Sequence, residues 1–304
     1  MARPGVPLRH RLGQNFLRDK DVVREIADAA DINTNDVVIE IGSGAGALTG
    51  ELARRAFFVA ALEIDERMLP ILREATSGHP NVALVQGDAL AANFDEVLSV
   101  VPPPPNLAAE SESGSGLDSG LGSKPRPRAK FKVVANLPYY ITTPILARLI
   151  EEIGGWRLAV VMVQKEVADR MAAAPGSKAY GALSILIQFH CDIELIRDVP
   201  PESFVPPPSV TSTVVRLNRR SEPKADVADV RLFFRLVRAA FSQRRKMLKN
   251  ALTAGCPDLA AGPGFWEGVL TAAGVPLMAR GEVLGIEDFA RIANIIRAGD
   301  YRAR

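Results

Sequence analysis

The sequence predicts an α/β protein with a doubly wound, mostly parallel sheet of the Rossmann type and a smaller C-terminal α-helical domain. Apolar strands alternate with helical segments between residues 37 and 173. A glycine-rich turn, EIGSGAGALTG at residues 40–50, follows the first of these strands. From residue 226 onward the apolar residues recur at helical spacing. We therefore expect a catalytic domain over residues 1–220 and a helical domain over residues 221–304.

The elements are expected in a simple order along the chain. Asp19 is placed to cap a first helix. The expected strands are 37–41, 58–62, 82–85, 131–135 and 158–163, with helices starting near residue 48 and over 66–74, 144–152 and 165–173. The runs 193–199 and 210–217 are expected to close one sheet edge as a hairpin-like pair. A stripe of apolar residues predicts a helix beyond Asp226, formed by Val230, Phe233, Phe234, Val237 and Phe241.

Composition narrows the class of protein. With 304 residues and 47% hydrophobic content, the chain can bury a full core. Its apolar runs are far shorter than the roughly 20 residues of a membrane span, and the N-terminus lacks an apolar signal core. Cys191 and Cys256 have no paired metal-site spacing, so no metal is predicted. These features predict a soluble cytoplasmic protein.

Residues 101–130 interrupt the alternation of strands and helices. Half of these positions are Pro, Gly or Ser, including the run SESGSGLDSGLGS. We expect a disordered surface insertion, because such a composition cannot bury enough apolar surface to fold. A partner-docking loop that uses Lys124, Arg126, Arg128 and Lys130 is the alternative.

The net charge of +2 hides an uneven distribution. Residues 1–20 hold five Lys or Arg against one acid, and residues 216–250 hold eleven against three. The remaining residues are therefore net acidic. Clustered cations favour a polyanionic partner, because several phosphates can be neutralised together. Simple solvation of helix faces is the alternative.

The glycine loop predicts a nucleotide-like cofactor. Gly42, Gly44 and Gly46 lie between a strand and a helix, where missing side chains let the backbone approach a ligand. The same letters fit the G-x-G-x-x-A pattern of nicotinamide enzymes, so a dehydrogenase is one alternative. A tight structural turn is another. In both cofactor interpretations Glu63, at the end of the second strand, accepts hydrogen bonds from ribose hydroxyls.

Two further acids favour S-adenosylmethionine over a nicotinamide cofactor. Asp88, in QGDAL, is placed to accept a hydrogen bond from an adenine amine, and a purely structural turn aspartate is the alternative. Glu40, at the strand end, is placed to meet the amino group of an amino-acid moiety, which a nicotinamide cofactor lacks.

The tetrapeptide Asn136-Leu137-Pro138-Tyr139 directly follows an apolar strand. Its amide, rigid proline and aromatic ring suit it to hold a flat base whose exocyclic amine is the methyl acceptor. The Asn136 amide oxygen and the Leu137 carbonyl are expected to accept the amine N–H groups, which directs the nitrogen lone pair at the methyl donor. Tyr139 is expected to stack on the base, and a core position for its ring is the alternative.

The sequence resembles the ribosomal RNA adenine N6,N6-dimethyltransferases, most closely the bacterial small-subunit (KsgA-type) branch. The resemblance covers nearly the whole chain, through GQNFL (13–17), EIGSGAGALT (40–49), LEID (62–65), QGDAL (86–90), NLPYYITTPI (136–145), QKEVADRM with APGSKAYGALS (164–184) and SFVPPPSVTSTVVRL (203–217). It departs from the family at Ser209, where a basic residue is frequent, and in the long 101–130 segment.

The resemblance implies a class I methyltransferase fold and roles for the matching residues. Phe204 would sandwich the target base against Tyr139, and simple packing beside the neighbouring prolines is the alternative. Gln14, Asn15 and Leu17 would cover the bound cofactor, while Gly42, Gly44, Glu63, Asp88, Ala89 and Asn136 would line its pocket.

The segment FSQRRKMLKNAL (241–252) is expected to form one helix with a cationic and an apolar face. Its cations, Arg244, Arg245, Lys246 and Lys249, would bind folded RNA through phosphate contacts.

The expected function is S-adenosylmethionine-dependent dimethylation of two neighbouring adenosines near the 3′ end of small-subunit (16S) ribosomal RNA. The expected enzyme is a monomer without a membrane partner, and its substrate is a partly assembled small subunit. A large-subunit methyltransferase of the antibiotic-resistance type and a ribosome-assembly RNA-binding factor are the alternatives.

Overall fold

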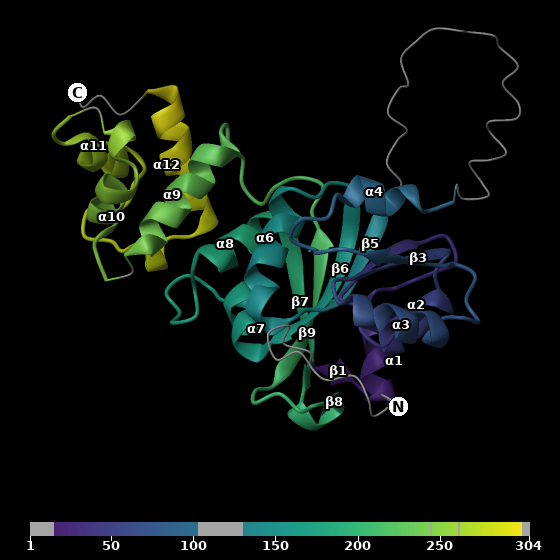
Figure 1. The fold of residues 1–304 in the computed structure, drawn as a ribbon. Helices are drawn as coiled ribbons and strands as arrows, with labels where there is room; N and C mark the ends of the chain where they lie inside the picture. The colour runs from purple at the N-terminus through teal and green to yellow at the C-terminus, as the bar shows by residue number, and fades with distance from the viewer. Residues whose placement is uncertain (1–14, 103–129, 244, 261, 300–304) are drawn as a thin grey trace, which may run out of the picture. The chain divides into compact units, whose positions relative to one another are not determined.

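The computed structural model describes residues 15–102, 130–243, 245–260 and 262–299 (Figure 1). The chain packs as two compact units: residues up to 165 with 194–219, and residues 166–193 with those from 220 onward. The expected functional division at residue 220 stays a prediction. Most of the expected 101–130 insertion lies outside the described residues. No helix within the described ranges is long and apolar enough to cross a membrane.

A seven-stranded sheet forms the centre of the first unit (Figure 1). Its order is β4 (Val82–Gln86), β3 (Phe58–Glu63), β2 (Val37–Ile41), β5 (Phe131–Asn136), β6 (Trp156–Gln164), β9 (Ser212–Arg219) and β7 (Cys191–Val199). The five strands from β4 to β6 are parallel, and β9 runs antiparallel to β6. The α/β prediction is confirmed, and β7 and β9 lie together at one edge as expected. A separate two-stranded sheet pairs β1 (Phe16–Leu17) with β8 (Phe204–Val205).

The strand order reverses between β2 and β5, which are neighbours although β3 and β4 separate them in sequence. Ile41 pairs with Ala135 in register, so the two strands end side by side. In open α/β sheets, ligands bind at the carboxyl ends of strands where the order reverses. The glycine loop leaves β2 and the NLPY turn leaves β5, so this rule places both at one site.

Short helices connect the strands of the first unit. They are α1 (Lys20–Ala29), α2 (Ala47–Ala53), α3 (Leu69–Ala75), α4 (Phe94–Ser99) and α6 (Thr142–Glu151), with 3-10 turns η2 (Glu66–Met68), η3 (Tyr139–Ile141) and η4 (Pro201–Ser203). Asp19 caps α1 as expected, because its side chain accepts hydrogen bonds from the amides of Asp21 and Val22. The expected helix over 66–74 begins as the 3-10 turn η2, and α4 was not anticipated.

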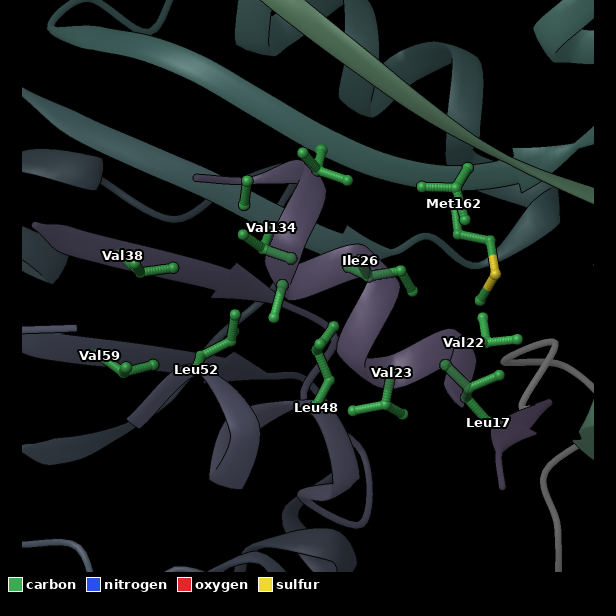
Figure 2. Close-up of a cluster of buried hydrophobic side chains, with 14 of the residues drawn as sticks. Leu17, Val22, Val23, Ile26, Val38, Leu48, Leu52, Val59, Val134 and Met162 are labelled. Atoms are coloured by element: carbon green, nitrogen blue, oxygen red, sulfur yellow. The ribbon is translucent and has the colours of Figure 1, made fainter. Parts of the chain in front are cut away.

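Helix α1 packs its apolar face against the sheet, where Val22 and Ile26 are fully buried (Figure 2). The sheet contributes side chains from four parallel strands to this cluster: Val38, Val59, Val134 and Met162. These residues are on the same face because successive side chains of a strand alternate between faces. The cluster joins the strands that carry the site residues at their ends.

The second unit is helical apart from the start of β7. It contains α7 (Lys165–Ala172, from residue 166), α8 (Ala182–His190), α9 (Val230–Ser242), α10 (Leu248–Gly255), α11 (Phe265–Ala272) and α12 (Ile286–Ala298), with turns η5 (Pro257–Leu259) and η6 (Gly281–Val283). The expected stripe on α9 is largely confirmed, since Phe233, Phe234 and Val237 are buried, although Val230 is partly exposed. Phe189 of α8 stacks on Phe233 with ring centroids 4.8 Å apart.

The single helix expected over residues 241–252 is wrong. Helix α9 ends at Ser242, and α10 begins only at Leu248. Gln243 leaves helical geometry, with φ −134° and ψ 71°. The amide of Leu248 donates to the carbonyl of Ala279 at 2.8 Å instead of continuing α9. Helices α9 and α10 each bury an apolar face, so the helical spacing of apolar residues continues across the break. The sequence pattern therefore did not reveal where α9 ends.

A buried ion pair lies near the start of the parallel strands. Lys132 of β5 is 2% exposed, and its Nζ lies 2.8 Å from Oδ2 of Asp36, which also pairs with Arg157. Burial alone would raise the pKa of Asp36, but the hydrogen bond from Lys132 and the two positive charges outweigh it and lower the pKa. The Asp36 carboxylate therefore depends on these cations to stay ionised while buried.

Lys132→Met should lower the free energy of unfolding by about 3 to 5 kcal/mol, because it leaves the buried Asp36 carboxylate with one cation. Urea denaturation measures the loss. The matched control is Arg197→Met, which breaks the exposed 2.6 Å pair with Glu25 and should cost at most about 1 kcal/mol. Equal losses in the two variants would contradict the assigned role of Lys132.

Candidate active site

A pocket opens at the carboxyl ends of β2, β3 and β5, where the glycine loop meets the NLPY turn. Its lining comes from segments far apart in sequence: Asn15, Phe16, Leu17, Glu40, Gly42, Ser43, Gly44, Ala45, Ala47, Leu48, Glu63, Ile64, Asn136, Leu137, Pro138, Tyr139, Tyr140 and Ile141. Ten residues that the sequence assigned to catalysis or cofactor binding are among them. Gln14, also expected here, lies outside the described residues.

The glycine loop adopts a conformation that requires glycine. Gly42 and Gly44 have φ of +78° and +53°, which L side chains rarely adopt. A Cβ on Gly44 would also lie 3.1 Å from the Phe16 ring. The loop therefore packs closely against Phe16 of β1, and the absence of side chains at Gly42 and Gly44 leaves room for a ligand.

The amides of the first three loop residues, 42 to 44, already have acceptors within the protein. Those of Gly42 and Ser43 donate to the carbonyl of Leu62, and Gly44 N–H donates to Oε2 of Glu63 at 2.7 Å. A phosphate-binding loop would instead present free amides to its ligand. A pyrophosphate here would also meet the Glu63 carboxylate. The geometry therefore does not favour the dehydrogenase alternative.

Glu63 is held rigidly at the end of β3. Its Oε1 accepts the amide of Asp65 at 2.9 Å, while Oε2 accepts that of Gly44. Each carboxylate oxygen has two lone pairs, so both oxygens can accept another hydrogen bond. A fixed bidentate acceptor suits a pair of ribose hydroxyls, as the sequence predicted for Glu63.

Glu40 is a fully buried acid on β2. Its pKa is raised to about 7: burial is the largest cause and the negative charge of Glu63 adds to it, while the hydroxyls of Ser43 and of Thr49, which donates to Oε2 at 2.5 Å, oppose the shift. Near neutral pH this carboxyl is close to its midpoint of ionisation. A cationic group in the pocket would favour the ionised form, so Glu40 suits an ammonium ligand.

Ser43 adds a polar group that the sequence did not single out. Its Oγ is buried near the Glu40 carboxyl, but it makes no hydrogen bond of good geometry among the described residues. A buried hydroxyl without a well-formed hydrogen bond is costly, and such groups frequently point to a ligand. Ser43 belongs to the pocket lining.

Asn136 ends β5 with its side-chain orientation fixed by one hydrogen bond. Its Nδ2 donates to the carbonyl of Asn15 at 3.2 Å. Only the nitrogen of an amide can donate to a carbonyl, so Oδ1 is left as the acceptor. This arrangement provides the oxygen acceptor that the sequence predicted, and it also explains why Asn15 is at the site.

Hydrogen bonds to β6 and β9 hold the rest of the NLPY turn in place. The Leu137 side chain is 1% exposed, and its amide donates to the carbonyl of Met162 on β6 at 3.1 Å. The Tyr139 hydroxyl shares a 2.6 Å hydrogen bond with Oγ of the buried Ser212. Burial raises the pKa of Tyr139, so the phenol is neutral at physiological pH. The ring is therefore held in place without carrying charge.

Phe204 is placed differently from the sequence-based expectation. The ring is 2% exposed and packs in the core cluster with Leu17 and Val22, and it does not line the pocket. A buried ring offers no free face to a base. Its stacking role against Tyr139 stays a prediction that requires β8 to rearrange.

Asp88 and Ala89 lie on the turn after β4, outside the pocket lining. Oδ1 of Asp88 accepts the amide of Leu90 at 2.8 Å. Burial raises the pKa of Tyr140, and the Asp88 charge raises it further, so the carboxylate lies near a lining residue. The adenine-binding roles of Asp88 and Ala89 stay predictions.

Two exposed apolar residues at the pocket were missed by the sequence analysis. Ile64, directly after Glu63, is 43% exposed, and Tyr140, directly after Tyr139, is 53% exposed. Their positions beside two predicted site residues were the available signal. Large apolar side chains that stay exposed at a pocket suit contact with a planar ligand.

The predicted RNA-binding cations belong to the second unit. Arg245 and Lys246 are exposed in the turn between α9 and α10, and Lys249 on α10 pairs with Glu267 at 3.0 Å. Arg244 lies outside the described residues. Met278, whose side chain is 76% exposed, precedes Ala279, and the Ala279 carbonyl accepts the hydrogen bond from the Leu248 amide at the start of α10.

Comparison with known proteins identifies the family. The profile of the ribosomal RNA adenine dimethylases matches residues 6–293. The chain belongs to the ribosomal RNA adenine dimethylase family. It is thus an S-adenosylmethionine-dependent ribosomal RNA adenine dimethyltransferase, as the sequence predicted.

Individual relatives are similar over nearly the full chain. "Ribosomal RNA small subunit methyltransferase A" of Bacillus cytotoxicus is 44% identical, covering 96% of this chain and 92% of the relative. The protein of the same name from Bacillus mycoides is 43% identical with the same coverage.

Two solved structures share the fold of this dimethylase. A dimethyladenosine transferase from Plasmodium falciparum has a TM-score of 0.73 and 25% identity, covering 93% of this chain and 98% of that one. The 23S rRNA methyltransferase ErmE has a TM-score of 0.63 and 28% identity, covering 93% and 100%. The class I methyltransferase fold is therefore confirmed.

The residues of the pocket fit S-adenosylmethionine. Its amino-acid part carries an ammonium, which suits the buried acid Glu40, and hydroxyls of its ribose suit the fixed Glu63 carboxylate. The Ser43 hydroxyl, which makes no well-formed hydrogen bond within the described chain, suits a polar atom of the same ligand. No group of three or more His, Cys, Asp or Glu within the described ranges is arranged to hold a metal ion.

Glu40→Gln should stabilise the ligand-free protein at alkaline pH. The pKa of Glu40 is raised in the folded state, so folding retains a proton that the unfolded chain loses, and stability falls as pH rises from about 4.5 to about 7. The loss is about 3 kcal/mol, at about 1.36 kcal/mol per pKa unit. Glutamine keeps an acceptor for Thr49 without this penalty.

Urea denaturation at pH 5 and pH 8 measures the effect. Glu40→Gln should gain up to about 3 kcal/mol over the wild type between the two pH values. Glu66→Gln, at an exposed position nearby, is the control and should leave the pH dependence unchanged. Identical pH dependence in wild type and Glu40→Gln would show that Glu40 is not the titrating group.

Proposed function

We propose that this dimethylase transfers two methyl groups to N6 of each of two adjacent adenosines near the 3′ end of small-subunit (16S) ribosomal RNA, during maturation of that subunit. The observation that carries the proposal is the Asn136 amide, whose Nδ2 binds the Asn15 carbonyl. Its Oδ1 is thereby assigned as an acceptor in a pocket that the glycine loop also lines.

The chemistry of the amine explains why acceptors are needed. The nitrogen lone pair of an adenine amine is delocalised into the ring, which makes the amine a poor nucleophile. Bound S-adenosylmethionine supplies a methyl group on a positively charged sulfur. Asn136 Oδ1 and the Leu137 carbonyl each accept an amine N–H, which frees the lone pair and fixes its direction. The hydrogen bond from Leu137 N–H to Met162 holds that peptide in place.

No strong general base is required in this proposal. Once the nitrogen carries the new carbon, its proton is acidic and passes to an acceptor oxygen or to water. Tyr139, held by Ser212, contributes stacking, which is worth roughly 1 to 3 kcal/mol per base. The target base has to leave its neighbours before it can enter the pocket.

The small subunit is favoured as substrate by the relatives that carry this activity in their names. They are 43–44% identical over 96% of this chain, whereas ErmE, a 23S rRNA methyltransferase, is 28% identical. Primer extension on both ribosomal RNAs, after incubation of immature subunits with the enzyme, separates the two substrates. Methylation of 23S rRNA alone would replace the proposal by the large-subunit alternative.

The RNA surface is proposed on the second unit, at the turn between α9 and α10. Arg245 and Lys246 are exposed there, while the nearby Lys249 is paired with Glu267. Exposed cations on a turn can neutralise several phosphates together. A monomer acting in the cytoplasm, where small subunits are assembled, completes the proposal.

Asn136→Ala should lower methyl transfer by about 10³-fold or more while leaving cofactor affinity largely unchanged, since it removes an acceptor used in the transition state. Single-turnover transfer of labelled methyl to immature small subunits measures the rate, and calorimetry measures cofactor affinity. Asn218→Ala, which removes an amide paired with Glu194 on the sheet edge, should retain activity. Near-normal transfer by Asn136→Ala would refute the acceptor role, and inactivity of wild type would favour the assembly-factor alternative.

Replacing Arg245 and Lys246 together with Ala should weaken RNA binding and flatten its salt dependence by about one to two units of log–log slope. Filter binding over a range of salt concentrations measures the slope. The control is Arg235→Ala, because Arg235 of α9 is already paired with both oxygens of Asp258. A slope that stays at the wild-type value in the double variant would place the RNA surface elsewhere.

A further inference from the structure

Arg148 of α6 connects two parts of the first unit through every nitrogen of its guanidinium. Nη1 donates to the carbonyl of Ala89, Nη2 donates to that of Ala92 at 2.7 Å, and Nε donates to Glu152 at 3.1 Å. The guanidinium also lies 5.7 Å from the centre of the Phe94 ring. Its side chain is only 17% exposed, so these contacts are largely shielded from water.

The two carbonyls belong to the turn that carries Asp88. Within this turn, the amides of Ala91 and Ala92 donate to the carbonyl of Asp88, and the amide of Leu90 donates to its side chain. These bonds shape the turn but do not attach it to the sheet. Arg148 supplies a fixed attachment, since its planar fork binds two carbonyls at once.

The same helix also begins at the NLPY turn. Thr142, the first residue of α6, donates from Oγ1 to the carbonyl of Pro138 at 3.0 Å. Helix α6 therefore contacts the NLPY turn at its start and the Asp88 turn near its end. A rigid helix attached at both ends sets the spacing between the two turns.

We propose that Arg148 is a positioning residue of the cofactor site: it holds the Asp88–Ala92 turn in place and thereby sets the affinity for the S-adenosyl ligand. The inference rests on the proposed adenine-binding role of Asp88 and Ala89. Arg148 acts through the turn and does not itself line the pocket. The proximity of Asp88 to Tyr140, a lining residue, supports this path from the turn to the ligand.

The chain offers a matched control in Arg219 of β9. Its Nη1 and Nη2 donate to the carbonyls of Ile153 and Ile150, at 3.2 and 3.3 Å. Its guanidinium lies 4.7 Å from the centre of the Trp156 ring. Arg219 thus makes the same kinds of contact as Arg148, in the same unit, but with residues that do not line the pocket.

The experiment compares Arg148→Lys with Arg219→Lys. Lysine keeps the charge but has no planar fork, so it cannot bind both carbonyls in the same way. Isothermal calorimetry with S-adenosylhomocysteine gives affinity, and urea denaturation gives stability. We expect Arg148→Lys to weaken binding about tenfold, equivalent to about 1.4 kcal/mol, and Arg219→Lys to change it less than about twofold despite a similar loss of stability.

A double-mutant cycle with Asp88→Asn tests whether Arg148 acts through the turn. Two residues that act through one structure have non-additive effects. In the Asp88→Asn background, Arg148→Lys should therefore weaken S-adenosylhomocysteine binding by less than about threefold. A full tenfold effect in that background would overturn the inference.

The other possible results distinguish a failure of the role of Arg148 from a failure of the role of Asp88. Wild-type affinity in Arg148→Lys, together with weak binding by Asp88→Asn, overturns the role of Arg148 alone. Equal weakening by Arg148→Lys and Arg219→Lys also overturns it, because the effect is then general loss of stability. Wild-type affinity in Asp88→Asn removes the proposed role of Asp88, and the inference falls with it.

Discussion

The pairing of β2 with β5 is the constraint on which the site depends. These strands are neighbours in the sheet although residues 42–130 separate them in the chain. Their register places Glu40 beside Val134 and Ile41 beside Ala135, so the glycine loop and Asn136 emerge next to each other. A parallel sheet cannot slip this register by one residue without moving its buried side chains to the opposite face. The acceptor and the cofactor loop are thus held together by the core of the first unit.

The polar groups of the pocket are fixed by their neighbours before a ligand arrives. Glu63 is held by two backbone amides, Asn136 by the Asn15 carbonyl, and Tyr139 by Ser212. Such preorganisation lets hydrogen-bonding groups act on a reacting centre without reorienting at the moment of reaction. Glu40 and Ser43 differ from these three, since the pKa of Glu40 is raised and the Ser43 hydroxyl makes no hydrogen bond of good geometry in the described residues. A buried acid with a raised pKa and a buried hydroxyl without a well-formed hydrogen bond both lower the stability of the ligand-free protein. Such groups are expected where a ligand supplies the missing interactions.

The sequence could predict the site where chemistry and strand ends coincide. Gly42, Gly44, Glu40, Glu63 and the NLPY turn lie at, or directly after, the ends of strands that are recognisable from their apolar residues, and all line one pocket. Prediction was less successful where function depends on packing between distant segments. The burial of Phe204 in the α1 cluster and the break between α9 and α10 arise from contacts with Leu17 and Ala279, which no local pattern contains.

The sequence by itself determined the alternation of strands and helices, the glycine loop, the acids at strand ends and the family to which the chain belongs. These features are local, because periodicity, backbone freedom and motif spacing depend on neighbouring residues. Only the tertiary structure decided how the Asn136 amide is oriented, that the amides of residues 42 to 44 are already bonded, and that Arg148 joins α6 to the Asp88 turn. Those facts depend on hydrogen bonds between residues far apart in the chain, whose partners are fixed only when the core is packed.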